Sequence, residues 1–207
     1  RGGWLMAGYA PTKSVLLQVR RTLSFAREGH DLLEQKREFL VMELMHYVNR
    51  VRILEKEFLL KNASLRETYG RALFHGGIRP LIESGRSVRP SWRIFIRETP
   101  VMGLNLPEAR VEDEGKPSFP AGMDGGAAFD ELAHAVRELM STLVELAAVK
   151  TAVWQLAREV KKTQRRVNAL DRIVIPDNEA MEKHIQDVLE ESERAAFFVQ
   201  KRLRDTR

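Results

Sequence analysis

The sequence predicts an all-α-dominated protein, in which a long antiparallel two-helix coiled coil is joined by a small central β-hairpin and loop region. Three observations lead to this prediction. Apolar residues recur at heptad spacing over residues 12–75, which is typical of coiled-coil helices. Prolines and glycines concentrate between residues 76 and 126, and a second heptad pattern then fills residues 127–207.

The first long helix is expected over residues 12–75. Thr12 is a suitable N-cap, with Ser14 as the alternative. The pair Gly76-Gly77 is expected to stop the helix. At about 1.5 Å per residue, roughly 60 residues would give a helix about 90 Å long. Residues 1–11 are expected to be an N-terminal tail, part of which would be upstream sequence if the natural start is Met6.

The seam of this helix has two sets of heptad positions. One set holds the apolar residues Leu16, Leu23, Leu44, Val51, Phe58, Leu65 and Ala72. The other set holds Val19, Ala26, Leu33, Leu40, Tyr47 and Leu54. Polar residues fill the remaining seam positions, which are His30, Arg37, Lys61 and Thr68.

Residues 76–126 are expected to contain a small hairpin and a loop. The run 91–97 (SWRIFIR) is rich in β-formers and precedes a second short apolar run, 101–106. The stretch 108–126, rich in glycine and acidic residues, indicates a loop or linker.

The second long helix is expected over residues 127–207. A kink is expected near Pro176, because a proline inside a helix removes a backbone hydrogen bond. Before the proline, the apolar seam residues are Phe129, Leu132, Val136, Leu139, Leu143, Leu146, Val153, Ala157, Val160, Val167 and Val174, with Lys150 as a polar departure. After it, the apolar face holds Met181, Ile185, Val188, Leu189, Ala195 and Phe198.

Two long helices bury their seams most simply against each other, as an antiparallel coiled coil. A globular four-helix bundle is the alternative. It would need breaks in the heptad runs, for which the sequence offers Gly29 and Pro176.

Composition limits the possible functions. The 207 residues are 43% hydrophobic, 30% charged and 7% aromatic, which suits solvent-exposed helices with a narrow apolar seam. The absence of cysteine excludes disulfides and thiolate metal sites. The net charge of +5 is compatible with nucleic acid, an acidic membrane surface or an acidic protein as partner. No apolar run approaches the roughly 18 residues that a membrane span needs.

The sequence predicts no catalytic, cofactor-binding or metal-binding residue. No two histidines lie three to five residues apart, so a helical metal-binding pair is absent. Glycine-rich phosphate loops and GxSxG elbows are also absent. His30 is interpreted as a tolerated polar residue of the seam.

Two charged segments stand out in the second helix. The basic collar consists of Arg158, Lys161, Lys162, Arg165, Arg166 and Arg172. The acidic zone consists of Asp177, Glu179, Glu182, Asp187, Glu190, Glu191 and Glu193. Both are either ordinary solvated helix faces or surfaces that meet complementary charge on a partner. Aromatic residues are not interleaved with the collar, which disfavours nucleic-acid binding.

The run 162–171 (KTQRRVNALD) and the following 172–176 (RIVIP) resemble the signature of the V/A-type rotary ATPase D-subunit family. The runs 193–201 (ERAAFFVQK), 11–13 (PTK) and 29–38 (GHDLLEQKRE) are also similar to family patterns. The resemblance covers both helices, roughly three quarters of the chain. Asp171 stands where the family more often has Glu, and the middle region matches weakly.

The resemblance implies a central rotor shaft without a catalytic site or cofactor of its own. Its partners would be the ring of catalytic A and non-catalytic B subunits, the small rotor subunit called F, and a socket subunit above the membrane ring. One copy would act in each complex, on the cytoplasmic side, associated with the membrane through the complex and not inserted in it. Nucleic acid would not be a partner.

The family role and the charged segments together suggest residues that contact partners. On the helices these are Lys13, Lys161, Lys162, Arg165, Arg166, Asn168, Glu190, Glu193 and Arg194. On the hairpin, Trp92 and Ile94 are expected to contact the small rotor subunit or the lower ring, or only to close the end of the coiled coil. A basic coiled-coil adaptor that binds nucleic acid or an acidic protein is the alternative function.

Overall fold

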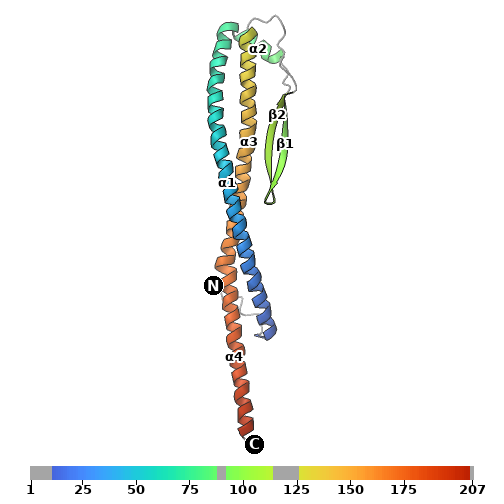
Figure 1. Cartoon of the computed structure of the whole chain (residues 1–207), viewed down its shortest axis with the longest axis vertical. Coiled ribbons are helices and arrows are strands. Elements are labelled where there is room, and N and C mark those ends of the chain that lie inside the picture. The colour runs from blue at the N-terminus through green and yellow to red at the C-terminus, as the bar shows by residue number, and fades with distance from the viewer. Residues whose placement is uncertain (1–10, 88–91, 114–125, 206–207) are drawn as a thin grey trace. The chain divides into compact units, whose positions relative to one another are not determined.

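The computed structural model describes residues 11–87, 92–113 and 126–205. The elements follow in the order α1 (Lys13–Gly76), α2 (Ile78–Ser87), β1 (Trp92–Val101), β2 (Leu104–Asp113), α3 (Gly126–Ala169), η2 (Leu170–Val174) and α4 (Ile175–Asp205) (Figure 1). Long helices with one small antiparallel sheet confirm the predicted fold class. The expected tail 1–11 falls, except for its last residue, outside the described residues.

The chain divides into two compact units. The terminal unit comprises residues 1–39 and 160–207, and the central unit comprises residues 40–159. Within each unit, α1 runs antiparallel to the helical segment that follows the hairpin: later residues of α1 contact earlier residues of that segment, as in an antiparallel coiled coil. In the terminal unit the contacts are Lys13–Glu193, Arg20–Glu182, Arg27–Glu179 and Arg37–Gln164. In the central unit they are Arg50–Glu145, Lys61–Thr142 and Arg71–Glu131.

Both ends of α1 follow from local sequence. The Thr12 hydroxyl accepts a hydrogen bond of 3.3 Å from the backbone N–H of Val15, which confirms Thr12 as the N-cap. At the other end, Gly77 has a φ of 77°, and its N–H donates to the carbonyl of Leu73 at 3.0 Å. This left-handed glycine satisfies a carbonyl that the ending helix would otherwise leave free.

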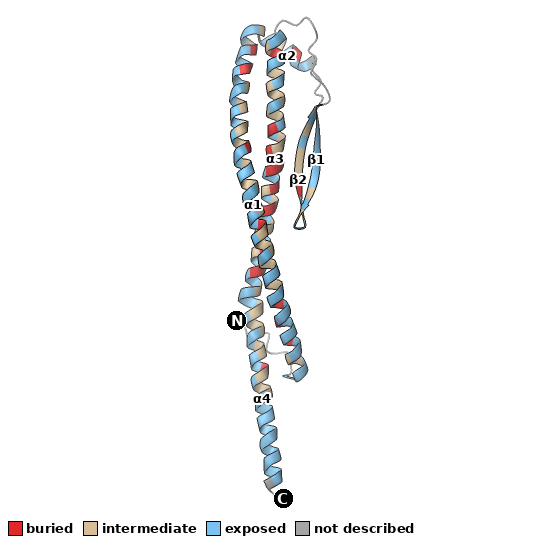
Figure 2. Ribbon diagram, in the orientation of Figure 1, coloured by how far each residue is buried: buried red, intermediate tan, exposed pale blue. Residues whose placement is uncertain are grey.

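The predicted seam of α1 is confirmed. Every heptad position from Leu16 to Ala72 is buried or half-buried, and this includes the polar residues His30, Arg37 and Lys61 (Figure 2). In the central unit, Leu54 packs with Leu146 and Val149 to form a core cluster. The polar seam residues keep hydrogen-bonding partners. Lys61 donates to Thr142 at 2.8 Å and pairs with Glu57 at 2.7 Å.

The predicted seam of α3 is wrong at several positions. Leu143, Lys150 and Ala157 are exposed, whereas the residues immediately before them, Thr142, Val149 and Leu156, are buried. The spacing of inward-facing residues therefore shortens by one between Leu139 and Thr142, which a strict heptad count does not allow for. Threonine is tolerated in the seam because its hydroxyl bonds within the helix. Thr142 donates to the carbonyl of Glu138 at 3.2 Å.

The hairpin is longer than predicted. Strands β1 and β2 pair antiparallel from Trp92↔Asp113 to Val101↔Leu104. Met102 and Gly103 both have positive φ, at 48° and 81°, which is the geometry of a tight type I′ turn. The prediction of a loop over 108–126 is wrong for residues 108–113, which belong to β2, and residues 114–125 lie outside the described residues.

A short helix, α2, occupies part of the region where only a hairpin and loop were expected. Pro80 stands at its third position, where the backbone N–H has no partner within the helix, so proline does not oppose the helix there.

Pro176 lies within helix. The chain forms a π-helical turn, η2, immediately before α4, and the N–H of Ile175 bonds back to the carbonyl of Leu170, five residues earlier. The side-chain amide of Asn178 donates to the carbonyl of Val174 at 2.6 Å. Wider turns of this kind absorb the missing donor of a proline. The kink expected near Pro176 stays a prediction.

Candidate functional site

Four residues of the basic collar, Lys161, Lys162, Arg165 and Arg166, lie on the outer face of α3 in the terminal unit. Thr163 and Val167 face the seam, with 2% and 4% of their surface exposed. The residues between and around them, Lys161, Arg165 and Arg166, are exposed as a consequence of the helical period. Arg165 and Arg166 have no ion pair or hydrogen bond within the described part of the chain. Their charge is therefore available to another molecule.

Two further residues of the collar region are engaged within the chain. Lys162 is exposed but already interacts within the chain. Asn168 accepts a 2.8 Å hydrogen bond from the Gln164 side chain, which in turn accepts one of 3.1 Å from Arg37. Asn168 thus belongs to a polar chain that reaches α1.

The acidic zone is partly an internal feature of the terminal unit. Glu182 pairs with Arg20 at 2.8 Å, and Glu179 pairs with Arg27 at 2.7 Å. These pairs could not be recognised from the charge run alone, because the positions of Arg20 and Arg27 opposite the zone depend on how the helices align. Two acids of the zone are therefore already paired with α1.

Four of the predicted contact residues pair with one another. Lys13 and Glu193 form an ion pair of 2.8 Å, although both side chains are largely exposed. The hydrogen bond from Lys13 and then its charge hold the pKa of Glu193 below its ordinary value, and the same pair raises the pKa of Lys13. Arg194 and Glu190 form a longer pair of 3.4 Å on one helix face. Exposed pairs of this kind contribute little to stability.

On the hairpin, Trp92 is half-buried, whereas Ile94 is 55% exposed and stands opposite Val111. Ile96, two residues on, is 70% exposed. The same face of β1 thus presents apolar side chains to solvent, as a contact surface would.

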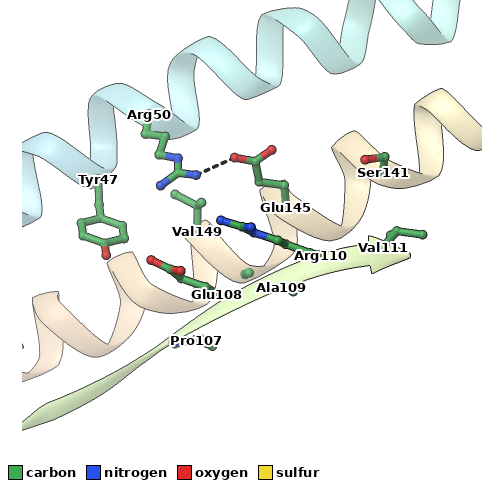
Figure 3. Close-up of a pocket in the computed structure, with 11 residues that line it drawn as sticks. Tyr47, Arg50, Pro107, Glu108, Ala109, Arg110, Val111, Ser141, Glu145 and Val149 are labelled. Atoms are coloured by element: carbon green, nitrogen blue, oxygen red, sulfur yellow. Dashed lines mark hydrogen bonds and ion pairs between the residues drawn. The ribbon is translucent and has the colours of Figure 1, made fainter. Parts of the chain in front are cut away.

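A cleft of about 480 Å³ lies between β2 and the helices of the central unit, and no pattern in the sequence indicated it (Figure 3). Arg50 and Glu145 pair across it at 2.6 Å, and Glu108 and Arg110 enter it from β2. Burial first, then the charges of Glu108 and Glu43, raise the pKa of Tyr47 above its ordinary value of 10.0. The Tyr47 hydroxyl is therefore protonated at neutral pH.

The lining of this cleft combines charged side chains with small and apolar ones. Its residues are Tyr47, Arg50, Pro107, Glu108, Ala109, Arg110, Val111, Ser141, Glu145, Ala148 and Val149. A serine nucleophile is commonly activated by a neighbouring histidine, and this lining contains no histidine. The chemistry of the cleft suits packing between hairpin and helices.

Two groups of large apolar side chains are exposed near element ends. Phe74, Ile78 and Ile82 surround the junction of α1 and α2 in the central unit, with 86%, 63% and 50% of their surface exposed. Phe197 and Phe198 of α4 are 67% and 72% exposed. The prediction that Ala195 and Phe198 lie on the apolar face of the coil is wrong, because both are exposed. Exposed apolar groups of this size mark contact surfaces.

Within residues 11–87, 92–113 and 126–205, no three His, Asp or Glu side chains gather to hold a metal ion. No helix in the same described ranges is long and apolar enough to cross a membrane.

Comparison with known proteins identifies the family. The model of the ATP synthase D-subunit family matches residues 15–205. The D-subunit of the A-type ATP synthase of Thermococcus gammatolerans is 34% identical over 197 residues, covering 94% of this chain and 92% of that protein. The D-subunit of the V-type ATP synthase of Thermotoga neapolitana is 32% identical, covering 95% and 97%. A V-type ATP synthase D-subunit of Treponema pallidum, numbered 2, is 34% identical, covering 94% and 93%. This chain therefore belongs to the ATP synthase D-subunit family.

Proposed function

We propose that this chain is the central stalk subunit of a V/A-type ATP synthase or ATPase. It couples ATP hydrolysis or synthesis in a ring of A and B subunits to rotation of a membrane ring and to ion transport. The observation that carries this function is the family match over residues 15–205, on a chain whose two long helical segments pair antiparallel in both units. ATP is bound and cleaved on the partners, and this chain is non-catalytic.

The terminal unit faces the ring of A and B subunits. Arg165 and Arg166 project from α3 without partners in the described part of the chain, and acidic groups on the ring satisfy them. Phe197 and Phe198 add exposed apolar surface near the end of α4. Long, flexible arginine side chains suit a contact that must be remade at each step of rotation.

The central unit meets the socket subunit and the small rotor subunit. The exposed Phe74, Ile78 and Ile82 at the α1–α2 junction fit an apolar recess, which we assign to the socket subunit. The exposed face of β1 around Ile94 meets the small rotor subunit. One copy of the chain serves each complex, which attaches it to the cytoplasmic side of the membrane.

The test is assembly of the ring in vitro. This chain is co-expressed with the A, B and F subunits and analysed by size-exclusion chromatography and native mass spectrometry. The expected product contains one copy of this chain for three A and three B subunits, and its ATPase activity depends on the chain. A folded chain that stays outside the ring would refute the function.

The collar is tested in the same system with the double variant Arg165→Glu and Arg166→Glu. It is expected to enter the ring less well, or to uncouple ATPase activity from rotation, with unchanged helical content. The matched control is Arg79→Glu, which reverses an exposed cation of α2 in the central unit. Equal behaviour of collar and control variants would remove the collar from the mechanism.

A further inference from the structure

Arg37, from the run 29–38, connects α1 to the family-signature run of α3 within the terminal unit. Its Nη1 donates a hydrogen bond of 3.1 Å to Oε1 of Gln164, and its Nη2 donates one of 2.8 Å to Oε1 of Glu34 on its own helix. Nε2 of Gln164 in turn donates at 2.8 Å to Oδ1 of Asn168. We call these four residues the Arg37 network.

The network holds its members in one arrangement. The Arg37 guanidinium occupies a seam position, where its side chain is 25% exposed. It engages one acceptor on each helix, and its planar shape fixes the angle between the two hydrogen bonds. The Gln164 amide is used at both ends, because its oxygen accepts from Arg37 while its nitrogen donates to Asn168. The rotation of α3 about its own axis is therefore tied to α1 at Gln164.

Burial specifies the rotation of α3 only weakly in this part of the unit. Thr163 and Val167 are buried, but the structure describes every residue between Val167 and Ile185 and none of them is buried. On α1, residues 27–39 are also all described, and none is buried. A seam with so little buried apolar surface gains little free energy from one rotation over another. A polar contact then decides between rotations, as polar residues at seam positions of coiled coils do.

The Arg37 network opposes a turn of α3 in either sense. Successive residues of an α-helix are about 100° apart, so a turn of that size would put each residue in its neighbour's place. In one sense Arg165 would replace Gln164 opposite Arg37, and two like charges would meet. In the other sense Lys162 would take the seam position of Thr163 and lose part of its hydration. The contact between Arg37 and Gln164 thus keeps Arg165 on the outer face.

We propose that Arg37 is a positioning residue for the ring contact: acting through Gln164, it holds α3 in the rotation that presents Arg165 and Arg166 to the ring. The role rests on the proposed function, to which the ring contact belongs, whereas the geometry of the network does not. A cation in the seam costs stability compared with an apolar residue. In return the outer arginines have a single orientation, which a shaft that transmits torque requires.

The first test measures the rotation of α3 in the free full chain. The sequence contains no cysteine, so Gln35→Cys and Ala169→Cys, both at exposed positions, introduce two unique sites for spin labels. Pulsed electron paramagnetic resonance then gives the distribution of distances between the labels. Arg37→Met is expected to broaden this distribution or to add a second peak. Its thermal midpoint should equal or exceed that of the labelled parent chain, because an apolar residue suits the seam.

The matched control is Arg21→Met, which removes a cation from an exposed position of α1 in the same unit. Within the described ranges Arg21 has no ion pair or hydrogen bond. This variant changes the net charge as Arg37→Met does, and an unchanged distance distribution is expected. Gln164→Ala removes the acceptor on α3 and is expected to reproduce the effect of Arg37→Met on the distances.

The second test asks whether Arg37 acts through the collar. Arg37→Met is expected to weaken binding to the ring of A and B subunits by about tenfold, and Arg21→Met by less than about twofold. Neutralising the collar with Arg165→Gln and Arg166→Gln is also expected to weaken binding. Adding Arg37→Met to that variant should weaken binding by less than about twofold more, because no collar charge is left to position.

The outcomes separate this proposal from the proposed function. The positioning role is overturned by unchanged label distances in Arg37→Met, by a thermal midpoint several degrees lower, or by a full further loss of binding in the collar variant. It is also overturned if Arg37→Met weakens ring binding no more than Arg21→Met does. In these cases the central-stalk function stands. A chain that does not enter the ring at all overturns that function, and with it the ring contact, whatever the label distances are.

Discussion

Replacing Gly76 by alanine is expected to lower the free energy of unfolding by about 1–3 kcal/mol. A Cβ at this position would lie 2.4 Å from Cζ and 2.6 Å from Cε1 of Phe129, well inside van der Waals contact. Phe129 is 2% exposed, so its ring has little room to move. The better helix propensity of alanine offsets up to about 1 kcal/mol of this cost, which places the expected net loss in the lower half of the range.

The assay is urea unfolding of the full chain, followed by circular dichroism at 222 nm, with the midpoint and slope compared between variants. Phe129→Leu removes the ring atoms that a Cβ at residue 76 would meet. The double variant should therefore lose about 1 kcal/mol less than the sum of the two single variants.

The neighbouring Gly77 provides the control. Gly77→Ala is also expected to destabilise, by about 1–2 kcal/mol, because its φ of 77° is unfavourable for a residue with a Cβ. The nearest atom to its added Cβ is Cδ of Pro80, at an ordinary 3.9 Å, so Phe129→Leu should not relieve this loss. An unchanged midpoint for Gly76→Ala, or equal relief of both variants by Phe129→Leu, would refute the steric argument.

Three further outcomes are expected. Leu156→Ala, at a fully buried position, should cost about 2–5 kcal/mol in thermal unfolding, whereas Trp154→Ala, at a side chain 74% exposed, should stay within about 0.5 kcal/mol. Because the pKa of Tyr47 is raised, its neutral form contributes to the stability of the fold below about pH 10, and this contribution is lost as the pH rises through the raised pKa. The variant Tyr47→Phe should therefore lose less stability above about pH 10 than the unaltered chain. Lys13→Gln should move the pKa of Glu193 upward toward its ordinary 4.5, followed by carbon-13 NMR of the carboxyl group; an unmoved titration would mean that the ion pair is absent in solution.

The seam of α1 could be predicted from sequence because its heptad pattern never changes phase. Even His30 and Lys61 occupy the positions that the count assigns to them. In α3 the same count holds at Leu146 and Val167 but fails at every second seam position after Leu139, since an exposed Leu143 and a buried Thr142 reverse the expected order of polarity. Hydrophobicity alone cannot choose between two such neighbours when a threonine hydroxyl bonds to its own helix.

The sequence predicted a hairpin in the middle region, but not how far its second strand extends. The β-formers around Ile94 marked the first strand, whereas the second strand contains Glu108 and Glu112, which indicated a loop. Cross-strand pairing overrides this weak local preference. The cleft beside Tyr47 depends on contacts between residues far apart in sequence, so no local pattern announced it.

The positions of the expected partner-contact residues could also be predicted only in part. The helical period sufficed to place Arg165 and Arg166 on an outer face. It could not reveal that Glu193 is engaged by Lys13, because that pair joins opposite ends of the chain.

The π-helical turn before Pro176 has a consequence for all side chains beyond it. A turn that holds one extra residue rotates the following helix by about 100° relative to an uninterrupted one. Thr163, Val167 and Leu170 face inward, and in an uninterrupted α-helix the same alternation of four and three residues would bring His184 inward. In the structure Ile185 is buried instead and His184 is exposed. The angular phase of the end of α4 is set by a single turn, because His184 would face inward in place of Ile185 if residues 170–174 formed ordinary α-helix.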